Sequence, residues 1–174
     1  YNISGGPKYK TFSSIIGVSE FLSELGKDYV VKFDGLAGGK GVKVSGDHLH
    51  SHREALDYCS EIITNKGTFV IEQKFVGEEF SLMSFCDGET LKHMPIVQDH
   101  KRAFENDTGP NTGGMGTYSD ANHSLPFLNE SDVNEAKSIN LKTAKALKEE
   151  FNEGYVGILY GGFIATKNGV KLIE

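Results

Sequence analysis

The chain of 174 residues contains no tryptophan, only two cysteines and only four prolines. Two cysteines cannot form a disulfide framework, and Cys59 and Cys86 both lie in patterned segments, so we expect reduced packing residues of a cytosolic protein. No apolar run approaches the length of a membrane-spanning helix, and no signal-peptide pattern opens the sequence. The sequence therefore predicts a cytoplasmic protein without a membrane partner.

An excess of positive charge is also missing. The 18 basic residues are outnumbered by 24 acidic ones, and the formal net charge of −6 argues against a nucleic-acid-binding surface. A hydrophobic content of 38% is adequate for one compact domain or two small lobes, and 21 glycines predict many turns. The sequence begins at Tyr1 rather than Met and ends at Glu174 inside a strand pattern, so we expect a piece of a longer polypeptide.

The segment from Gln98 to Ser119 shows no apolar period of a strand or of a helix. A connection of this length is uncommon in a compact domain and is usually a functional loop or a disordered segment. The segment mixes charges with glycines and two apolar anchors, Phe104 and Met115, which is not the composition of disorder. Its glycines and proline predict no regular element through its second half; they are Gly109, Pro110, Gly113, Gly114 and Gly116.

The residue types of this loop suit a small polar ligand that carries an anionic group. Glycines allow successive backbone N–H groups to form an anion-binding concavity. Lys101 and Arg102 add positive charge, and Arg can hold a carboxylate or phosphate with two donors. Asp99 and Asn111 can bind an amine or a hydroxyl. A long solvated loop is the alternative interpretation.

A second glycine-rich segment, residues 35–41, connects two short strand patterns over residues 29–33 and 42–44. It is not a Walker A loop, because Asp34 occupies the position of the first glycine and Gly41 follows the lysine. With Lys40 inside it and Lys32 on the strand before it, the segment suits a flap that covers polyphosphate. A flexible hairpin with solvated lysines is the alternative interpretation.

Apolar periodicity predicts strands and helices around these loops. One helix is expected over residues 18–25, a second one has its apolar face between residues 55 and 63, and a third runs from Ser131, as N-cap, to about residue 151. The expected strands cover residues 9–12, 29–33, 42–44, 68–72, 79–86, 91–97, 155–166 and 170–174.

Several polar residues stand where strands end. Backbone groups after Glu72 could meet a purine edge, Glu78 or Glu79 could accept from ribose hydroxyls, and Glu174 follows a buried run, where a hard cation could bind. Taken singly, each carboxylate is more often a solvated charge. The alternating histidines at 48, 50 and 52 have no Cys or carboxylate at a recognised metal-site spacing, so a solvated connection is favoured over a metal site.

Four segments of the sequence resemble the phosphoribosylamine–glycine ligase family. Residues 99–104 (Asp-His-Lys-Arg-Ala-Phe) with 107–116 (Asp-Thr-Gly-Pro-Asn-Thr-Gly-Gly-Met-Gly) form the most specific one. Residues 30–42 are similar to the family's phosphate loop, and residues 69–81 to its adenine and ribose segment. Residues 155–163 and 170–174 are similar to the last hairpin before its metal ligands. The resemblance covers essentially the whole chain.

The resemblance implies an α+β fold of the ATP-grasp type, in which a small lobe closes over a larger, mainly antiparallel sheet with nucleotide between them. We expect the small lobe at residues 1–74 and the larger lobe, truncated at the metal site, at residues 75–174. The implied activity joins glycine to 5-phosphoribosylamine, with ATP, in de novo purine synthesis. A glycyl phosphate intermediate is implied, and the products are glycinamide ribonucleotide, ADP and phosphate.

The resemblance also implies a role for individual residues. Lys101 and Arg102 are expected to be catalytic, and Glu174 to be the first of two Mg²⁺ or Mn²⁺ ligands. The second ligand and an amino-terminal domain are expected in the rest of the same polypeptide. The expected nucleotide-binding residues are Lys32, Gly38, Gly39, Lys40, Gly41, Glu72, Lys74, Phe75 and Glu79. The expected substrate-binding residues are Asp99, Asn111, Thr112, Gly113 and Gly114.

The sequence departs from the family pattern near the nucleotide. Phe33 and Gly38 stand where the family usually has Ala, and the step Gln73-Lys74 replaces an acidic–aromatic step in the adenine segment. Two other functions stay open on the sequence: a different ATP-grasp carboxylate–amine ligase with another acceptor, and a module that binds ATP without catalysis.

Overall fold

The computed structural model describes residues 1, 3–37, 40–106 and 108–174 of the chain. The chain folds into two compact units, each with its own core. Unit 1 contains residues 1–6, 76–101 and 114–174, and unit 2 contains residues 7–75 and 102–113. Residues 102–113 therefore belong with the amino-terminal part of the chain, whereas the division expected from the sequence had a single boundary between residues 74 and 75.

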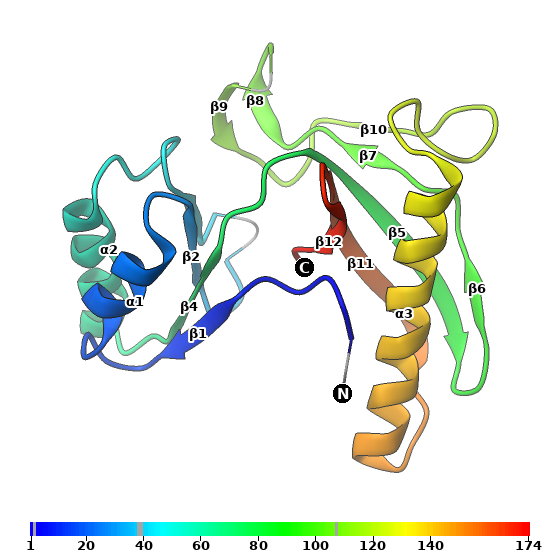
Figure 1. Cartoon of the computed structure of the whole chain (residues 1–174), viewed down its shortest axis with the longest axis horizontal. Helices are drawn as coiled ribbons and strands as arrows, with labels where there is room; N and C mark the ends of the chain where they lie inside the picture. Colours follow the sequence, from blue (N-terminus) through cyan, green and yellow to red (C-terminus); the bar gives the residue numbers. More distant parts are fainter. Residues whose placement is uncertain (2, 38–39, 107) are drawn as a thin grey trace. The chain divides into compact units, whose positions relative to one another are not determined.

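Unit 2 is built on a four-stranded antiparallel sheet in the order β1-β4-β2-β3. The strands are β1 (Tyr9–Phe12), β2 (Tyr29–Phe33), β3 (Val42–Val44) and β4 (Phe69–Gln73). Helices α1 (Val18–Leu25) and α2 (His52–Thr64) pack on one face of this sheet (Figure 1). All of these elements lie within one or two residues of the segments predicted from periodicity, except α2. This helix begins at His52, three residues before the first residue of the predicted apolar face.

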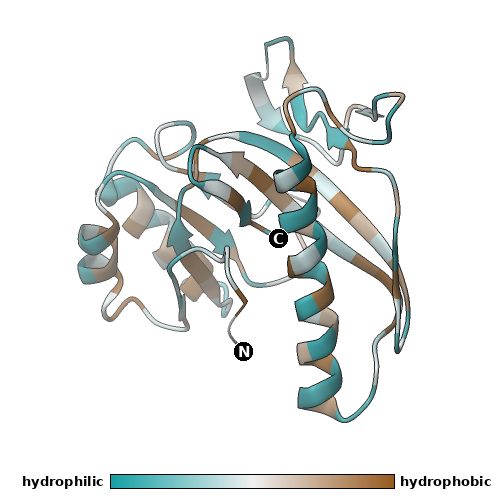
Figure 2. Cartoon of the chain, turned by 45° about the vertical axis from the view of Figure 1, so that its right-hand side comes forward, coloured by the Kyte–Doolittle hydropathy of each residue, from teal (hydrophilic) through white to brown (hydrophobic). Residues whose placement is uncertain are grey.

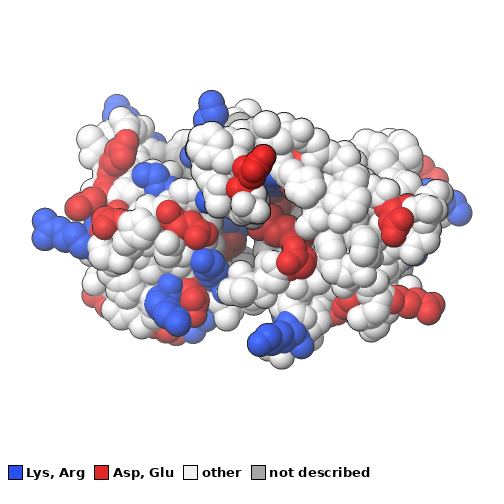
Figure 3. Space-filling view, turned by 90° about the horizontal axis from the view of Figure 1, so that it is seen from above, with Lys and Arg blue, Asp and Glu red and all other residues white. Residues whose placement is uncertain are grey.

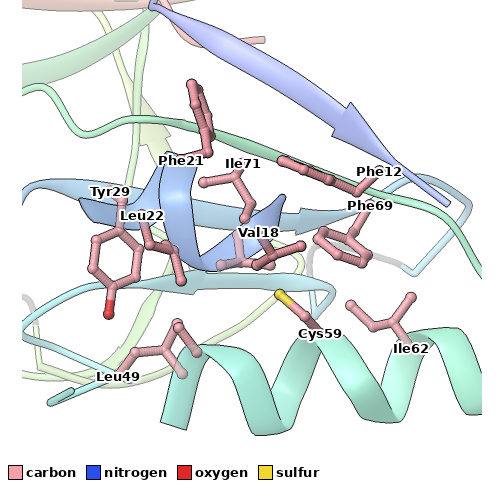
Figure 4. Packing of buried hydrophobic residues seen from close by; sticks show 12 residues of the cluster. Phe12, Val18, Phe21, Leu22, Tyr29, Leu49, Cys59, Ile62, Phe69 and Ile71 are labelled. Atoms are coloured by element: carbon pink, nitrogen blue, oxygen red, sulfur yellow. The ribbon is translucent and has the colours of Figure 1, made fainter. Parts of the chain in front are cut away.

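The core of unit 2 lies between the two helices and the sheet. Figure 4 shows Val18 of α1 and Cys59 of α2 beside the aromatic ring of Phe69 on β4, and Leu22 of α1 beside the ring of Tyr29 on β2. Val18, Phe21 and Leu22 recur at the spacing of one helical face, which explains why this short segment is helical. Helix α1 ends at Gly26, which has φ 71° and donates its N–H to Leu22 O.

A two-stranded ribbon completes unit 2 and corrects one expectation. Strands β8 (Arg102–Phe104) and β9 (Thr108–Asn111) pair antiparallel, although Gly109 and Pro110 had predicted no regular element there. Gly109 has φ 85°, and a Cβ on it would lie 2.4 Å from the Phe104 ring, so the glycine makes room for the aromatic side chain. Proline is tolerated because both strands of such a ribbon are edges.

Unit 1 contains a second four-stranded antiparallel sheet in the order β12-β11-β5-β6. Its strands are β5 (Glu78–Asp87), β6 (Leu91–His93), β11 (Val156–Thr166) and β12 (Gly169–Leu172). Helix α3 (Glu130–Phe151) lies along one face of this sheet (Figure 1), and Figure 2 shows the apolar residues carried by these strands. Two short strands, β7 (Gln98–Asp99) and β10 (Thr117–Tyr118), form a separate ribbon.

Helix α3 approaches the sheet closely at a glycine. Asn140 is buried, and its Nδ2 donates to Leu82 O at 3.0 Å and to Ser84 Oγ at 3.2 Å. A Cβ on Gly161 would lie 2.5 Å from Asn140 Oδ1, so the missing side chain is what admits this amide. Ala136 and Ile139 of the same helix pack against Phe80, Leu82 and Phe163.

Two sequence-based boundaries in unit 1 were wrong. The predicted strand over residues 91–97 ends at His93, because Pro95 lacks an N–H donor; beyond it Val97 forms an isolated bridge with Ser81. The N-cap of α3 is Asn129 rather than Ser131. The Asn129 side chain accepts from Ser131 N and Asp132 N, while the Asp132 carboxylate accepts from Asn129 N, which is a complete capping box.

The two cysteines are free and buried, and the expectation of packing residues is confirmed. Burial raises the pKa of the Cys59 thiol to about 12, because the ionised form would lose its hydration. Among the helices that the structure describes, none is long and apolar enough to cross a membrane.

Candidate functional site

In unit 2, the sheet face opposite the core carries an ion pair. Lys32 on β2 and Glu72 on β4 lie on strands that pair antiparallel, with Val30 opposite Glu72 and Lys32 opposite Val70. Their neighbours Val31 and Ile71 point the other way into the core, so alternation brings the lysine and the glutamate onto the same face. The two side chains form a salt bridge and are only 26% and 12% exposed. The family resemblance implies that both residues bind the nucleotide.

The glycine-rich flap of unit 2 packs around an aromatic ring. A Cβ on Gly35 would lie 2.6 Å from the Phe33 ring, and one on Gly41 would lie 3.0 Å from Phe33 Cβ. Gly41 O accepts from the Tyr58 hydroxyl at 3.2 Å and from Phe33 N. The bulky Phe33, a departure from the family pattern, is thus accommodated by glycines. Lys40 is exposed at the end of the flap. The predicted contacts of Gly38 and Gly39 lie outside the described residues.

Both the side chain and the backbone N–H of Lys74 form contacts within unit 2. Its Nζ donates to Ser45 O at 2.7 Å and lies 3.8 Å from the Asp47 carboxylate. Its backbone N–H donates to Asp28 O at 3.0 Å, so this N–H is already engaged. Among the backbone groups expected to meet adenine, the N–H of Lys74 is therefore already used in a hydrogen bond within the unit. Phe75, the next expected residue, is half-buried.

The ribbon β8–β9 and the two residues directly after it include three of the expected substrate residues and one of the expected catalytic ones. Arg102 and Asn111 are paired across the ribbon, and Thr112 and Gly113 follow directly. Nη1 of Arg102 lies 3.5 Å from Nε2 of His48, and His48 Nδ1 in turn accepts from Val44 N at 3.1 Å. Sequence reasoning missed His48, because a local histidine tract gives no signal of a partner more than fifty residues away.

The other expected residues meet in a pocket of unit 1. Its polar lining consists of Glu79 and Ser81 of β5, Asp99 and Lys101 after β6, Tyr160 of β11 and Glu174. Nζ of Lys101 lies 3.9 Å from Oε2 of Glu174. Ser81 Oγ and the Tyr160 hydroxyl are hydrogen-bonded at 3.0 Å. Ser81 and Tyr160 were not predicted, although the register of β5 against β11 places them on one face.

Gly162 fixes the backbone beside Glu174. Gly162 N donates to Glu174 O at 2.8 Å, and Ile173 N donates to Gly162 O at 2.9 Å. A Cβ on Gly162 would lie 3.1 Å from Glu174 Cβ and 3.3 Å from the Tyr160 ring. The glycine therefore leaves the space that lets the tyrosine and the glutamate lie side by side.

The turn of residues 114–116 folds back over Asp99 within unit 1. Strands β7 and β10 place Asp99 opposite Thr117, and Met115 N donates to His100 O at 2.7 Å. Gly114 has φ 124°, and a Cβ on it would lie 3.1 Å from Asp99 Oδ1. The ring of His100 stacks on Tyr118 with centroids 5.8 Å apart. The expected neighbours Asp99 and Gly114 are thus in contact.

The acidic side chains of the unit 1 pocket are of the type that binds a hard divalent cation. Glu79, Asp99 and Glu174 supply carboxylate oxygens, which Mg²⁺ and Mn²⁺ prefer. Within the described part of the chain, no three His, Cys, Asp or Glu side chains lie close enough together to hold a metal ion. Glu174 therefore shares its pocket with other carboxylates, but these do not form a complete ligand set. Seen from above in Figure 3, acidic and basic side chains are interspersed.

Solved structures with the same fold define the class of this domain. The phosphoribosylamine–glycine ligase of Thermotoga maritima matches with a TM-score of 0.83 and 28% identity, covering 98% of this chain and 42% of that one. The D-alanine–D-alanine ligase of Coxiella burnetii matches with a TM-score of 0.66 and 14% identity over 99% of this chain and 42% of that one, which shows the fold alone. With its antiparallel sheets and helices, the chain has the ATP-grasp fold, and the expected α+β class is confirmed.

The family follows from the sequence comparison. The model described as phosphoribosylglycinamide synthetase, ATP-grasp (A) domain, matches residues 1–174, and the chain belongs to this family. It is 52% identical to the phosphoribosylamine–glycine ligase of Methanosarcina barkeri over 174 residues and 50% identical to that of Methanobrevibacter smithii over 178 residues. All of this chain is covered in both comparisons, but it spans only about 40% of these curated relatives.

Proposed function

We propose that this chain is the nucleotide-binding part of an ATP-dependent ligase that joins glycine to 5-phosphoribosylamine. The observation that carries the proposal is the match of all 174 residues to the family domain, with identities near 50% to proteins that bear this ligase name. The two charged groups described above support it, because ATP-dependent ligation needs cations for phosphate and carboxylates for metal and ribose. The rest of the polypeptide would complete the enzyme in the cytoplasm.

Unit 2 would hold the nucleotide. Lys32 and Lys40 would neutralise phosphate oxygens, with Gly41 keeping the flap close to the strand. Glu72 orients the Lys32 ammonium, because the two side chains form a salt bridge on the open sheet face. Glu72 and the backbone near Phe75 would meet the adenine.

Unit 1 would hold the reacting groups. Glu79 would accept from ribose hydroxyls, and Glu174 would bind Mg²⁺ or Mn²⁺, which when bound would offset the charge of the phosphates. Lys101, 3.9 Å from Glu174, would guide an anionic oxygen into the same pocket. Asp99 and the turn that contains Gly114 would bind the amine or hydroxyl groups of the substrates.

The reaction balances in two steps. A carboxylate oxygen of glycine attacks the γ-phosphorus of ATP, forms glycyl phosphate and expels ADP. The amine of phosphoribosylamine then attacks the acyl carbon, loses a proton and expels phosphate, which leaves the amide of glycinamide ribonucleotide. The contribution of the chain is to position both partners, neutralise charge and exclude water from the acyl phosphate.

The proposal is tested on the full-length protein by ADP release. We expect release that requires phosphoribosylamine and glycine together, with little or none when other carboxylates replace glycine. Equal release with a different carboxylate would identify another ligase of the same fold. Calorimetry with ATP and Mg²⁺ separates a third outcome, since tight nucleotide binding without any turnover would identify a non-catalytic ATP-binding protein.

A further inference from the structure

Arg102 and His48 bring hydrogen-bond donors together in unit 2. Nε of Arg102 is buried and has no hydrogen-bond partner among the atoms that the structure describes. Nη1 of the same guanidinium lies 3.5 Å from Nε2 of His48. A guanidinium has only donors, so the contact can be a hydrogen bond only if His48 Nε2 accepts.

The local structure around His48 prevents Nε2 from accepting. Val44 is on the edge strand β3, and its N–H donates to His48 Nδ1 at 3.1 Å. The turn is closed from the other side as well, because His48 N donates to Val44 O at 2.9 Å. A neutral imidazole has one acceptor nitrogen, and the hydrogen bond at Nδ1 fixes the proton on Nε2. An N–H of His48 therefore faces an N–H of Arg102.

Of the charged groups that act directly on the His48 ring, three are positive and one is negative. Arg102, Lys43 and Lys74 act on the ring with positive charge and Asp47 with negative charge, while Glu54, Asp57 and Glu61 of α2 line the cavity on its helix side. Burial, and after it the Arg102 charge, lowers the pKa of His48, so the ring is a neutral donor near pH 7. Two facing donors with no acceptor between them are satisfied by an oxygen with free lone pairs.

We propose that His48 Nε2–H and the Arg102 guanidinium together bind an oxyanion, the phosphate or the carboxylate group of a substrate. One oxygen can accept from both nitrogens, because they are 3.5 Å apart and each hydrogen bond is about 2.9 Å long. The inference rests on the proposed function for the identity of the substrates. It adds His48 as a positioning donor and places the anionic group on the unit that carries Lys32.

Two isosteric substitutions in the full-length protein separate a donor role from a structural one. His48→Gln places an amide N–H₂ near the position of Nε2 but gives up the acceptor for Val44. His48→Asn keeps an acceptor near Nδ1 but loses the distal donor. His50→Gln is the matched control, because His50 is exposed two residues away. The probes are inorganic phosphate and glycine, each titrated by calorimetry without ATP.

We expect His48→Asn to weaken binding of the anion by about tenfold or more, as for a hydrogen bond to a charged group, and His48→Gln to stay within about threefold of the unmodified protein. The reverse pattern would mean that His48 only caps Val44 and would overturn the proposal. Unchanged binding in both variants would overturn it too. Loss in both is resolved by ¹⁵N NMR of the unmodified ring, where a proton on Nε2 that shifts with the anion supports the site and a proton on Nδ1 refutes it.

The two probes identify the source of the anion. Binding of phosphate that glycine does not displace assigns the phosphoryl-bearing substrate, and the converse assigns the amino acid. The outcome is independent of turnover, because no ATP is present. A protein that releases ADP with the expected substrates but binds neither probe through His48 would retain its proposed function and lose only this site.

Discussion

Each unit holds one lysine–glutamate pair at its candidate site, and the two pairs differ in burial. In unit 2, Lys32 and Glu72 form a close salt bridge at 26% and 12% exposure, held on neighbouring strands. In unit 1, the charged atoms of Lys101 and Glu174 are 3.9 Å apart, and the side chains are 40% and 69% exposed. Each residue lies two positions after the end of a strand, β7 and β12 respectively. The same residue types therefore make a preformed, partly dehydrated pair in one unit and an open pair in the other, which a ligand can separate at little cost.

The largest expected effect tests whether the two cores are independent. Phe69→Ala in unit 2 and Phe163→Ala in unit 1 should each destabilise the unit by about 3–5 kcal/mol, because both rings are fully buried. Hydrogen exchange would show loss of protection in the mutated unit alone. The control is Phe151→Ala, which removes an exposed ring and should change stability by less than about 0.5 kcal/mol. Equal loss of protection in both units would instead show a single cooperative structure.

The second prediction compares the ion pairs directly. Glu72→Gln should destabilise unit 2 by about 2–3 kcal/mol, because it leaves the partly buried Lys32 ammonium without its counter-charge. Glu174→Gln should cost less than about 0.5 kcal/mol, since its pair with Lys101 is exposed. Urea denaturation measures both. If the two substitutions lower the free energy of unfolding equally, burial does not determine how much each ion pair contributes to stability.

The third prediction uses the buried thiol of unit 2. Because burial raises the pKa of Cys59 to about 12, its folded thiol stays neutral at pH values where an unfolded thiol, with a pKa of about 8.5, ionises. Folding keeps this thiol neutral, and the contribution to the free energy of unfolding is fully present below about pH 8.5. It is lost as the pH rises toward 12, and about 2 kcal/mol of it is gone at pH 10. Denaturation from pH 7 to 10, compared with Cys59→Ala, isolates this loss. A slope unchanged by the substitution would contradict it.

The last prediction concerns nucleotide affinity and contrasts two lysines of unit 2. Lys32→Ala and Lys40→Ala should each weaken ATP binding by roughly 1–3 kcal/mol, the scale of a charge-assisted hydrogen bond. Lys32 should have the larger effect, since Glu72 already orients it, whereas Lys40 is exposed on the flap. Calorimetry of the full-length protein with ATP and Mg²⁺ measures both. Unchanged affinity in both variants would remove the flap and strand β2 from the nucleotide site.

Much of the architecture could be read from local patterns. Helix α1 and strands β1, β2 and β3 have the predicted bounds, because the alternation of apolar residues is set by burial on one face. The loop errors have local causes. Gly109 and Pro110 predict a break but lie in a ribbon of edge strands, and Asn129 caps α3 two residues before the predicted cap. The roles predicted for site residues remain predictions.

The amino-acid order alone determined which glycine-rich segments contain charged residues and where most strands and helices run, since both follow from neighbours along the chain. Only the tertiary structure decided that Lys101 and Arg102, adjacent in sequence, have their partners in different units: Glu174 in unit 1 and His48 in unit 2. The tautomer of His48 was likewise beyond the sequence. Partners of this kind come from distant segments, and backbone hydrogen bonds between strands, rather than periodicity, fix which side chains meet.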